Sequence, residues 1–349
     1  MARQFGNDNL LLVRFGDLEE RTRALTILKG VGIKVEDWMM DPDSYRPWPE
    51  TTHVLDVSWH RKEIVYCPPP FVCAAMASHG CRFYSVRELE RMAELGFKNE
   101  PRYPIFHIPH DGRYCPEELM ASVCVPKEVF MDYHERMRDK DVWQMIPRAY
   151  YTVHMTHFFN VSRLLCDVER FVGPEEIMEQ YGMGFCYEKA YDGTILKHVT
   201  DDLKAATRKY YDEHHAGINE ECEKHRNMLF FDMHSYTDEI IPPYARKENA
   251  RTPDLCIGTD ARFTPPRLKE IVMRRFSEIG FSIKENEPYS GFYIPETVLA
   301  DPSAYDFAGI MLEFNRRIYC DGTRETLPEH MESIRKAINR IMADCVELE

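Results

Sequence analysis

The stretch Met228-Leu229-Phe230-Phe231-Asp232-Met233-His234-Ser235 indicates which kind of fold this chain adopts. Its apolar run has the length of a strand buried inside a sheet, and an acid and a histidine follow at the carboxyl end. Similar runs alternate along the chain with helical patterns. The predicted strands cover residues 105–108, 164–168, 228–233 and 309–314, and helical patterns cover 203–225 and 266–280. This alternation predicts an α/β fold with a mixed, mainly parallel sheet flanked by helices.

Proline punctuation in the stretch Lys98-Asn99-Glu100-Pro101-Arg102-Tyr103-Pro104 marks a candidate domain boundary. We expect residues 1–100 to form a small N-terminal α/β or α+β domain and residues 101–349 to form the catalytic domain. In the first domain, strands are predicted at 10–13, 54–59 and 63–67, and helices at 18–28, 71–77 and 85–95. The last helix opens with the capping box Ser85-Val86-Arg87-Glu88. The role of this domain is left open between covering the active site, dimerisation and binding of a partner.

The composition is that of an acidic globular protein, with 349 residues and a net charge of -14. This charge disfavours nucleic acid as a partner, because phosphate binding needs a basic surface. No apolar run reaches the roughly 18 residues of a membrane span, and the first residues contain no segment of signal-peptide length. The 11 cysteines form no C-x-x-C pair, which indicates free thiols. We expect a cytoplasmic protein without a nucleic-acid or membrane partner, and a homo-oligomer is left open.

Each predicted strand runs into an unusual polar group at its carboxyl end. The groups are Pro109-His110-Asp111-Gly112, Asp167-Val168-Glu169-Arg170, Asp232-Met233-His234-Ser235 and Glu313-Phe314-Asn315-Arg316. Ligands of open α/β sheets bind at the carboxyl ends of the strands, so we expect one shared site. Two histidines and a carboxylate would form a three-ligand catalytic zinc site. Zinc activates water, a glutamate can move its proton, and arginines can hold a substrate carboxylate, which together suit amide hydrolysis.

Each of these residues also has an ordinary structural interpretation. Most of the 14 histidines cannot be metal ligands, and His107 is expected in the core. The pair His214-His215 is expected to pack or to support other residues. Asp232 is either the partner of a metal ligand or a buried, hydrogen-bonded carboxylate. Glu313, inside an apolar strand, has an ion pair with one of the two following arginines as its alternative.

The sequence resembles the N-formylglutamate amidohydrolase family, whose fold is similar to that of zinc carboxypeptidases. Seven stretches match the family in order, over about residues 104–319. They are Ile108-Pro109-His110-Asp111-Gly112, Ser162-Arg163-Leu164-Leu165-Cys166-Asp167-Val168-Glu169-Arg170-Phe171, Tyr210-Tyr211-Asp212-Glu213-His214-His215, Phe231-Asp232-Met233-His234-Ser235, Asp254-Leu255-Cys256-Ile257-Gly258-Thr259-Asp260, Pro288-Tyr289-Ser290-Gly291 and Glu313-Phe314-Asn315-Arg316-Arg317. One position departs from the pattern, because the family has serine where this chain has Asp111.

The resemblance implies a role for each matching residue. His110 and His234 would be zinc ligands, and Glu313 would be the general base. Arg163 would stabilise the oxyanion at the scissile carbonyl. Substrate binding would fall to three residues: Arg170 at the α-carboxylate, and Tyr289 and Ser290 on a loop at the pocket mouth.

The third metal ligand matches the family less closely. Carboxypeptidases place a glutamate three residues after the first histidine, but this chain has Arg113 there. The family instead carries a later acid, and the stretch Met137-Arg138-Asp139-Lys140-Asp141 resembles that segment, so Asp139 is the expected ligand. The alternatives are Glu117, Glu118, Asp132 and Asp141, and Asp139 could also be a solvated helix residue.

The leading hypothesis is hydrolysis of a small acidic N-acyl amino acid such as N-formylglutamate, with one zinc per chain. A zinc carboxypeptidase or peptide amidase is the first alternative, and it would need a longer cleft. A non-catalytic binding protein on a degenerate hydrolase fold is the second.

Overall fold

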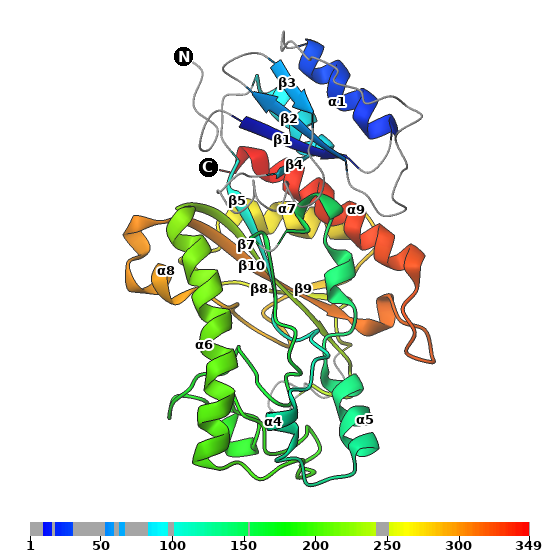
Figure 1. The fold of residues 1–349 in the computed structure, drawn as a ribbon. Helices are drawn as coiled ribbons and strands as arrows, with labels where there is room; N and C mark the ends of the chain where they lie inside the picture. Colours follow the sequence, from blue (N-terminus) through cyan, green and yellow to red (C-terminus); the bar gives the residue numbers. More distant parts are fainter. Residues whose placement is uncertain are drawn as a thin grey trace, which may run out of the picture.

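The computed structural model of the chain describes residues 10–15, 18–30, 53–58, 63–66, 83–96, 101–152, 154–241 and 251–348. Two sheets organise these residues, a six-stranded one in the larger part of the chain and a four-stranded one near the N-terminus (Figure 1). None of the helices in these ranges is long and apolar enough to cross a membrane. The eight cysteines within these ranges are free thiols, as predicted.

The six-stranded sheet has the order β6-β5-β7-β10-β8-β9. Its strands are β5 (Tyr103–Ile108), β6 (Thr156–Phe158), β7 (Asn227–Tyr236), β8 (Leu255–Gly258), β9 (Ile283–Glu285) and β10 (Asp306–Asn315). All neighbouring pairs are parallel except β8 and β10, which are antiparallel. The predicted mixed, mainly parallel sheet is therefore confirmed. The long central strands β7 and β10 are buried along almost their whole length, as their near-continuous apolar sequences require.

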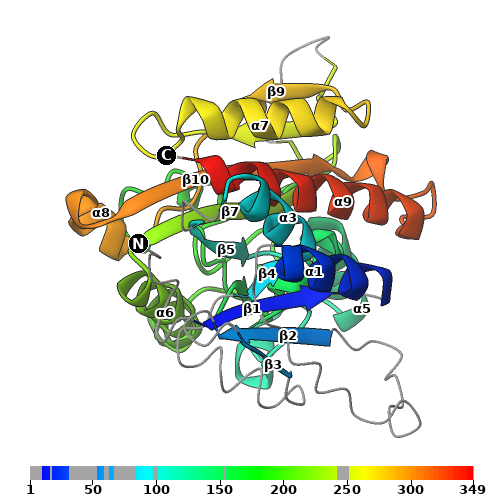
Figure 2. The ribbon, with the colours of Figure 1, turned by 90° about the horizontal axis from the view of Figure 1, so that it is seen from above.

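Helices cover both faces of this sheet. In Figure 1, α7 (Pro266–Ser277) and α9 (Pro328–Asp344) lie above the strands, and Figure 2 shows these two helices running side by side. The opposite side carries α4 (Glu117–Met120), α5 (Lys127–Met137) and α6 (Asp201–Lys224), while the short α8 (Glu296–Ala300) contacts α6. The helices predicted at 203–225 and 266–280 are confirmed as α6 and α7. Thr200 caps α6 by accepting a hydrogen bond from the backbone nitrogen of Leu203 at 3.2 Å.

The strand predicted at residues 164–168 is wrong, because this segment is a buried turn. The backbone nitrogens of Leu165 and Cys166 both donate to the Ser162 carbonyl, at 2.8 and 3.1 Å. Leu164, Leu165 and Cys166 are nevertheless fully buried, in a second apolar cluster beside the main core. A short buried loop has the same apolar run as a buried strand, so the pattern alone could not separate them.

The N-terminal part forms a separate sheet of order β3-β2-β1-β4. Its elements are β1 (Leu10–Phe15), α1 (Leu18–Gly30), β2 (His53–Ser58), β3 (Glu63–Tyr66), β4 (Phe83–Ser85) and α3 (Val86–Glu94). The predicted capping box is present: Ser85 accepts from the Glu88 nitrogen at 3.2 Å, and Glu88 accepts from the Ser85 nitrogen at 2.9 Å. The helix predicted at 71–77 lies outside the described residues.

The two sheets meet through α3, which packs against α9. Glu88 is fully buried there and accepts a hydrogen bond from the Tyr150 hydroxyl at 2.5 Å. Arg91 of α3 forms an ion pair with Glu347 near the other end of the chain. The division into an N-terminal domain of residues 1–100 and a catalytic domain of residues 101–349 stays a prediction.

Candidate active site

The polar residues singled out in the sequence converge at one edge of the six-stranded sheet. His110 lies two residues beyond the end of β5, while His234 and Glu313 lie near the ends of β7 and β10. These two strands run parallel in a register that sets Glu313 directly beside His234. In the same way, β5 and β7 set His107 beside Asp232. Parallel strands thus bring residues far apart in sequence to one place, as the topology predicted.

His110, Asp139 and His234 form a buried cluster in which one ligand atom from each lies within 4.8 Å of the others. The Nδ1 atoms of His110 and His234 are 3.6 and 3.0 Å from the same oxygen, Oδ2 of Asp139. Ligand atoms about 2.0–2.1 Å from a tetrahedral zinc ion are about 3.4 Å apart. The spacing and the two-nitrogen, one-oxygen donor set therefore fit zinc.

The opposite nitrogen of each imidazole contacts a buried aspartate. His110 Nε2 is 2.8 Å from Asp167 Oδ1, and His234 Nε2 is 3.1 Å from Asp232 Oδ1. An imidazole that donates from Nε2 presents the lone pair of Nδ1, which is how carboxylates orient metal-binding histidines. Within the described part of the chain, the buried Nδ1 of His110 has no hydrogen-bond partner. Asp232 is a buried carboxylate that also contacts His107 at 2.9 Å and accepts from the Tyr293 backbone nitrogen at 2.8 Å, and its role as the partner of a metal ligand stays a prediction.

The electrostatics of the cluster are strongly negative. Burial alone would lower the pKa of His234, but Glu169, Asp232 and Asp139 raise it well above its usual value. Burial would raise the pKa of Asp139, but the close contacts with the His110 and His234 imidazoles and the charge of Arg163 hold it well below its usual range. The carboxylates that raise the pKa of His234 give this cluster a negative electrostatic potential. Such a potential attracts a cation.

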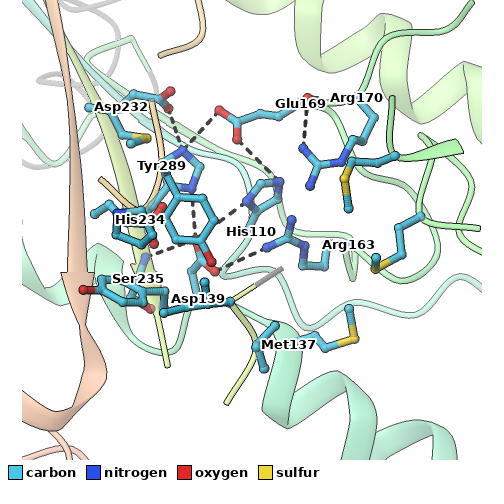
Figure 3. A pocket seen from close by; sticks show the side chains of 18 of the residues that line it. His110, Met137, Asp139, Arg163, Glu169, Arg170, Asp232, His234, Ser235 and Tyr289 are labelled. Carbon is cyan, nitrogen blue, oxygen red and sulfur yellow. Dashed lines mark hydrogen bonds and ion pairs between the residues drawn. The ribbon is translucent and has the colours of Figure 1, made fainter. Parts of the chain in front are cut away.

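Glu169 is a site residue that the sequence reasoning did not select. Its carboxylate is 14% exposed, with one oxygen 3.2 Å from His234 Nε2 and the other 3.7 Å from His110 Nε2. Figure 3 shows Glu169 on one side of the two imidazoles and Asp139 on the other. The available signal was its place between Asp167 and Arg170 in a stretch already matched to the family.

The neighbouring histidines lie beneath this cluster. His107 is fully buried, as predicted, and its Nδ1 is 2.9 Å from Asp232 Oδ1. The Nε2 atoms of His107 and His214 are 2.9 Å apart, so one donates to the other. His215 donates from Nε2 to the Val168 carbonyl at 2.7 Å. The expected packing role of the His214-His215 pair is confirmed: His214 contacts Asp232 through His107, and His215 holds the turn that contains Val168.

The other carboxylates considered as metal ligands lie apart from the two histidines. Glu117 and Glu118 are exposed on α4, and Glu118 accepts from the Tyr210 hydroxyl. Asp132 is exposed on α5 and pairs with Arg136. Asp141 is buried but bonds to Arg113 at 2.9 Å and to Thr326 at 2.5 Å. Asp139, which is buried rather than solvated, is the acid of this set that contacts both His110 and His234.

Glu313 is 7% exposed and lines the same cavity. Burial raises its pKa to about 8, a value at which a carboxylate both accepts and releases protons near neutrality. The alternative of an ion pair with the following arginines is not what the structure shows. Arg316 bonds to the Ser235 hydroxyl and to the carbonyls of residues 136 and 138, and Arg317 pairs with Asp238 and Asp254.

Two arginines stand beside the cluster in Figure 3. Arg163 donates from Nη2 to Asp167 at 2.9 Å and lies 3.5 Å from Asp139. Burial would lower the pKa of Arg163, but Tyr187 and the two aspartates raise it well above its usual value. Arg170 lines the cavity, and its buried Nε has no hydrogen-bond partner within the described residues. The Arg170 side chain is partly exposed, its Nε lies 3.9 Å from Asp167, and a guanidinium placed at a cavity wall in this way can bind a carboxylate.

Tyr289 and Ser290 lie between β9 and α8 and line the cavity wall. Tyr289 packs edge-on against Tyr236, with ring centroids 5.7 Å apart, whereas Ser290 is exposed. The cavity has a volume of about 1820 Å³. It brings together all eight predicted site residues: His110, Asp139, Arg163, Arg170, His234, Tyr289, Ser290 and Glu313.

Comparison with known proteins agrees with this architecture. The model of a family described as N-formylglutamate amidohydrolase matches residues 104–320. The crystal structure of N-formylglutamate amidohydrolase from Ralstonia eutropha JMP134 is similar, with a TM-score of 0.56, 16% identity and coverage of 72% of this chain and 95% of that one. A gene product of Agrobacterium tumefaciens has a TM-score of 0.46, 13% identity and coverage of 72% and 92%. A search of curated proteins gave no match.

Proposed function

The chain belongs to the N-formylglutamate amidohydrolase family, and we propose that it hydrolyses the amide bond of a small acidic N-acyl amino acid, of which N-formylglutamate is the first candidate. Its free thiols fit a reducing compartment, and we place the activity in the cytoplasm. One observation carries the catalytic proposal. Two imidazoles present Nδ1 to a shared carboxylate while buried aspartates hold their Nε2 atoms.

We propose that His110, Asp139 and His234 hold one zinc ion per chain. When bound there, zinc supplies Lewis acidity to the amide carbonyl and lowers the pKa of water. Asp167 and Asp232 fix the tautomer and orientation of the two histidine ligands. The nitrogen-rich donor set favours zinc over magnesium or calcium, which prefer oxygen ligands.

The remaining roles fall to side chains of the same cavity. Glu313 accepts the proton of the attacking water and delivers it to the leaving nitrogen, as its raised pKa allows. Arg163 stabilises the negative charge that develops on the carbonyl oxygen. Arg170, whose partly exposed side chain lines the cavity, binds the substrate carboxylate, and Tyr289 and Ser290 close the mouth of the cavity.

The size of the cavity favours a second candidate, hydrolysis of a longer N-acyl amino acid or a peptide. Sites for small ligands have volumes of about 300–1,000 Å³, and this cavity has about 1820 Å³. Zinc, base and arginine would act in the same way on the longer substrate. A non-catalytic binding protein is less favoured, because burying Glu313 without an ion-pair partner among the described residues, beside two oriented histidines, costs stability that such a protein need not spend.

The test is elemental analysis and formate release from N-formyl-L-glutamate, with wild type, His234→Ala and the exposed control His198→Ala. We expect about one zinc per chain in wild type and control, lost together with formate release in His234→Ala. Zinc with hydrolysis of only longer N-acyl amino acids or peptides would support the second candidate. A wild type that takes up no metal when zinc is supplied refutes the catalytic proposal.

A further inference from the structure

Asp111 stands where the family motif has serine, and its carboxylate makes contacts that a serine could not reproduce. It is 2% exposed. Its Oδ1 accepts from Arg138 Nη1 at 2.6 Å and from the backbone nitrogen of Asp141 at 2.9 Å, and its Oδ2 lies 3.3 Å from the backbone nitrogen of Trp143. A serine hydroxyl is shorter and has a single oxygen, so it cannot serve three donors spread over six residues.

These donors belong to the turn that carries Asp139. Arg138 precedes Asp139, and Asp141 follows it by two residues. Asp141 has a φ of 59°, a left-handed conformation that costs a residue other than glycine about 1 kcal/mol or more. The backbone bond from Asp141 to Asp111 holds this unfavourable conformation in place.

The same turn is tied to both histidines. The backbone nitrogen of Asp139 donates to the His110 carbonyl at 2.9 Å. His110 and Asp111 therefore both accept hydrogen bonds from residues 138–143. On the other side, Arg316 donates to the Arg138 carbonyl and, from Nε, to the Ser235 hydroxyl at 3.2 Å. The carboxylate of Asp139 therefore reaches His110 and His234 from a turn that is fixed at both ends.

We propose that Asp111 is a positioning residue, which sets the Asp139 carboxylate between His110 and His234 and thereby raises the affinity of the site for zinc. The inference rests on the proposed metal function of these three residues. The buried ion pair between Asp111 and Arg138 is the strongest of the contacts that hold this turn.

The experiment compares Asp111→Ser, which restores the family residue, with Asp111→Asn and with the exposed control Asp132→Ser on the adjacent helix. Zinc affinity is measured by competition with a chromophoric chelator, and the melting temperature of each metal-free protein is measured beside it. We expect the affinity of Asp111→Ser to fall about 10- to 100-fold, the usual cost of losing a group that orients a metal ligand. Asp111→Asn keeps one oxygen acceptor and should lose less, and the control should lose nothing.

Three results would overturn the inference. Equal zinc affinity in wild type and Asp111→Ser would do so, including when the melting temperature falls, because Asp111 would then support only the fold. If Asp111→Ser does not fold, unchanged affinity in Asp111→Asn has the same meaning. A wild type that binds no zinc overturns the proposed function as well, whereas zinc-binding wild type with insensitive variants overturns the role of Asp111 alone.

Discussion

Replacing Asp167 by asparagine should strongly destabilise the protein, although the shape of the side chain hardly changes. Asp167 is fully buried, and its Oδ1 accepts from His110 Nε2 at 2.8 Å and from the Glu169 backbone at 3.0 Å. Its Oδ2 accepts from Arg163 at 2.9 Å and from the Tyr187 hydroxyl at 2.8 Å. Burial would raise the pKa of Asp167, but the charges of the neighbouring histidine and arginines keep it well below its usual range. The group is therefore fully ionised at pH 7.

The expected loss in free energy of unfolding follows from these four contacts. An asparagine amide has one acceptor and one donor end, so in either orientation its NH₂ group faces another donor. The substitution also removes the nearest anion of Arg163, whose side chain is only 14% exposed, and breaking a buried ion pair costs about 3–5 kcal/mol. Arg163 keeps a weaker contact with Asp139 at 3.5 Å. We therefore expect a loss near the lower limit, about 3 kcal/mol.

The assay is urea unfolding of the metal-free protein at pH 7, followed by circular dichroism. Asp212→Asn is the matched control, because Asp212 is exposed on α6 and its ion pair is with Arg208 on the same helix. We expect the control to stay within about 0.5 kcal/mol of wild type. If Asp167→Asn unfolds with the same free energy as the control, the hydrogen bonds assigned to Asp167 do not hold the site together and the reasoning fails.

Three further predictions concern other parts of the molecule. Arg170→Gln should lower kcat/KM about 10- to 100-fold, mainly by raising KM, because a charged hydrogen bond to substrate is worth about 1.5–3 kcal/mol. An unchanged KM would show that Arg170 does not bind the substrate. Burial lowers the pKa of His134 and of His157 to about 4. The unfolded chain therefore binds protons at each histidine more readily than the folded protein does, and the free energy of unfolding should fall as pH drops from the unfolded pKa of about 6.5 toward 4. Each histidine should account for a loss of up to about 3 kcal/mol. Urea midpoints between pH 7 and 4.5 measure this, and the loss should shrink in His134→Gln and His157→Gln. Glu88→Ala removes the carboxylate that accepts from the Tyr150 hydroxyl and from the Ser85 backbone nitrogen at the start of α3. It should lower the free energy of unfolding by about 1–3 kcal/mol and speed proteolysis of the N-terminal part. Equal proteolysis rates in variant and wild type would contradict a role of Glu88 in joining the two sheets.

The sequence predicted the sheet because β5, β7 and β10 are apolar runs bounded by polar residues. It failed at residues 164–168, where the same apolar content fills a turn. What decides between the two is the partner of each backbone nitrogen, and Leu165 bonds locally to Ser162. Hydrophobic pattern reports burial, which both structures share, and carries no information on hydrogen-bond partners.

Site residues were predictable where a strand fixes their position. His234 and Glu313 follow from the ends of two neighbouring parallel strands. Asp139 and Glu169 lie outside strands, and they reach His234 across 95 and 65 residues of sequence. No spacing rule covers such contacts, because the path of the loops between them decides the distance. For Asp139 the family resemblance supplied what spacing could not, and Glu169 was overlooked inside a matched stretch.

The carboxylates around the two imidazoles give the site a negative charge, which bears on metal binding. Asp139, Asp167, Glu169 and Asp232 surround the two imidazoles, and Arg163 is the nearest permanent cation to any of them. Burying this many carboxylates is costly unless cations balance them. In the metal-free protein, arginines balance part of this charge, with Arg163 the nearest, and the carboxylates raise the pKa of His234, so that a proton on its imidazole adds to the balance. A divalent cation at the same place would supply the balance without that proton and would leave the imidazole neutral, as a ligand must be. The excess of acids is therefore a structural reason to expect a metal, independent of family resemblance.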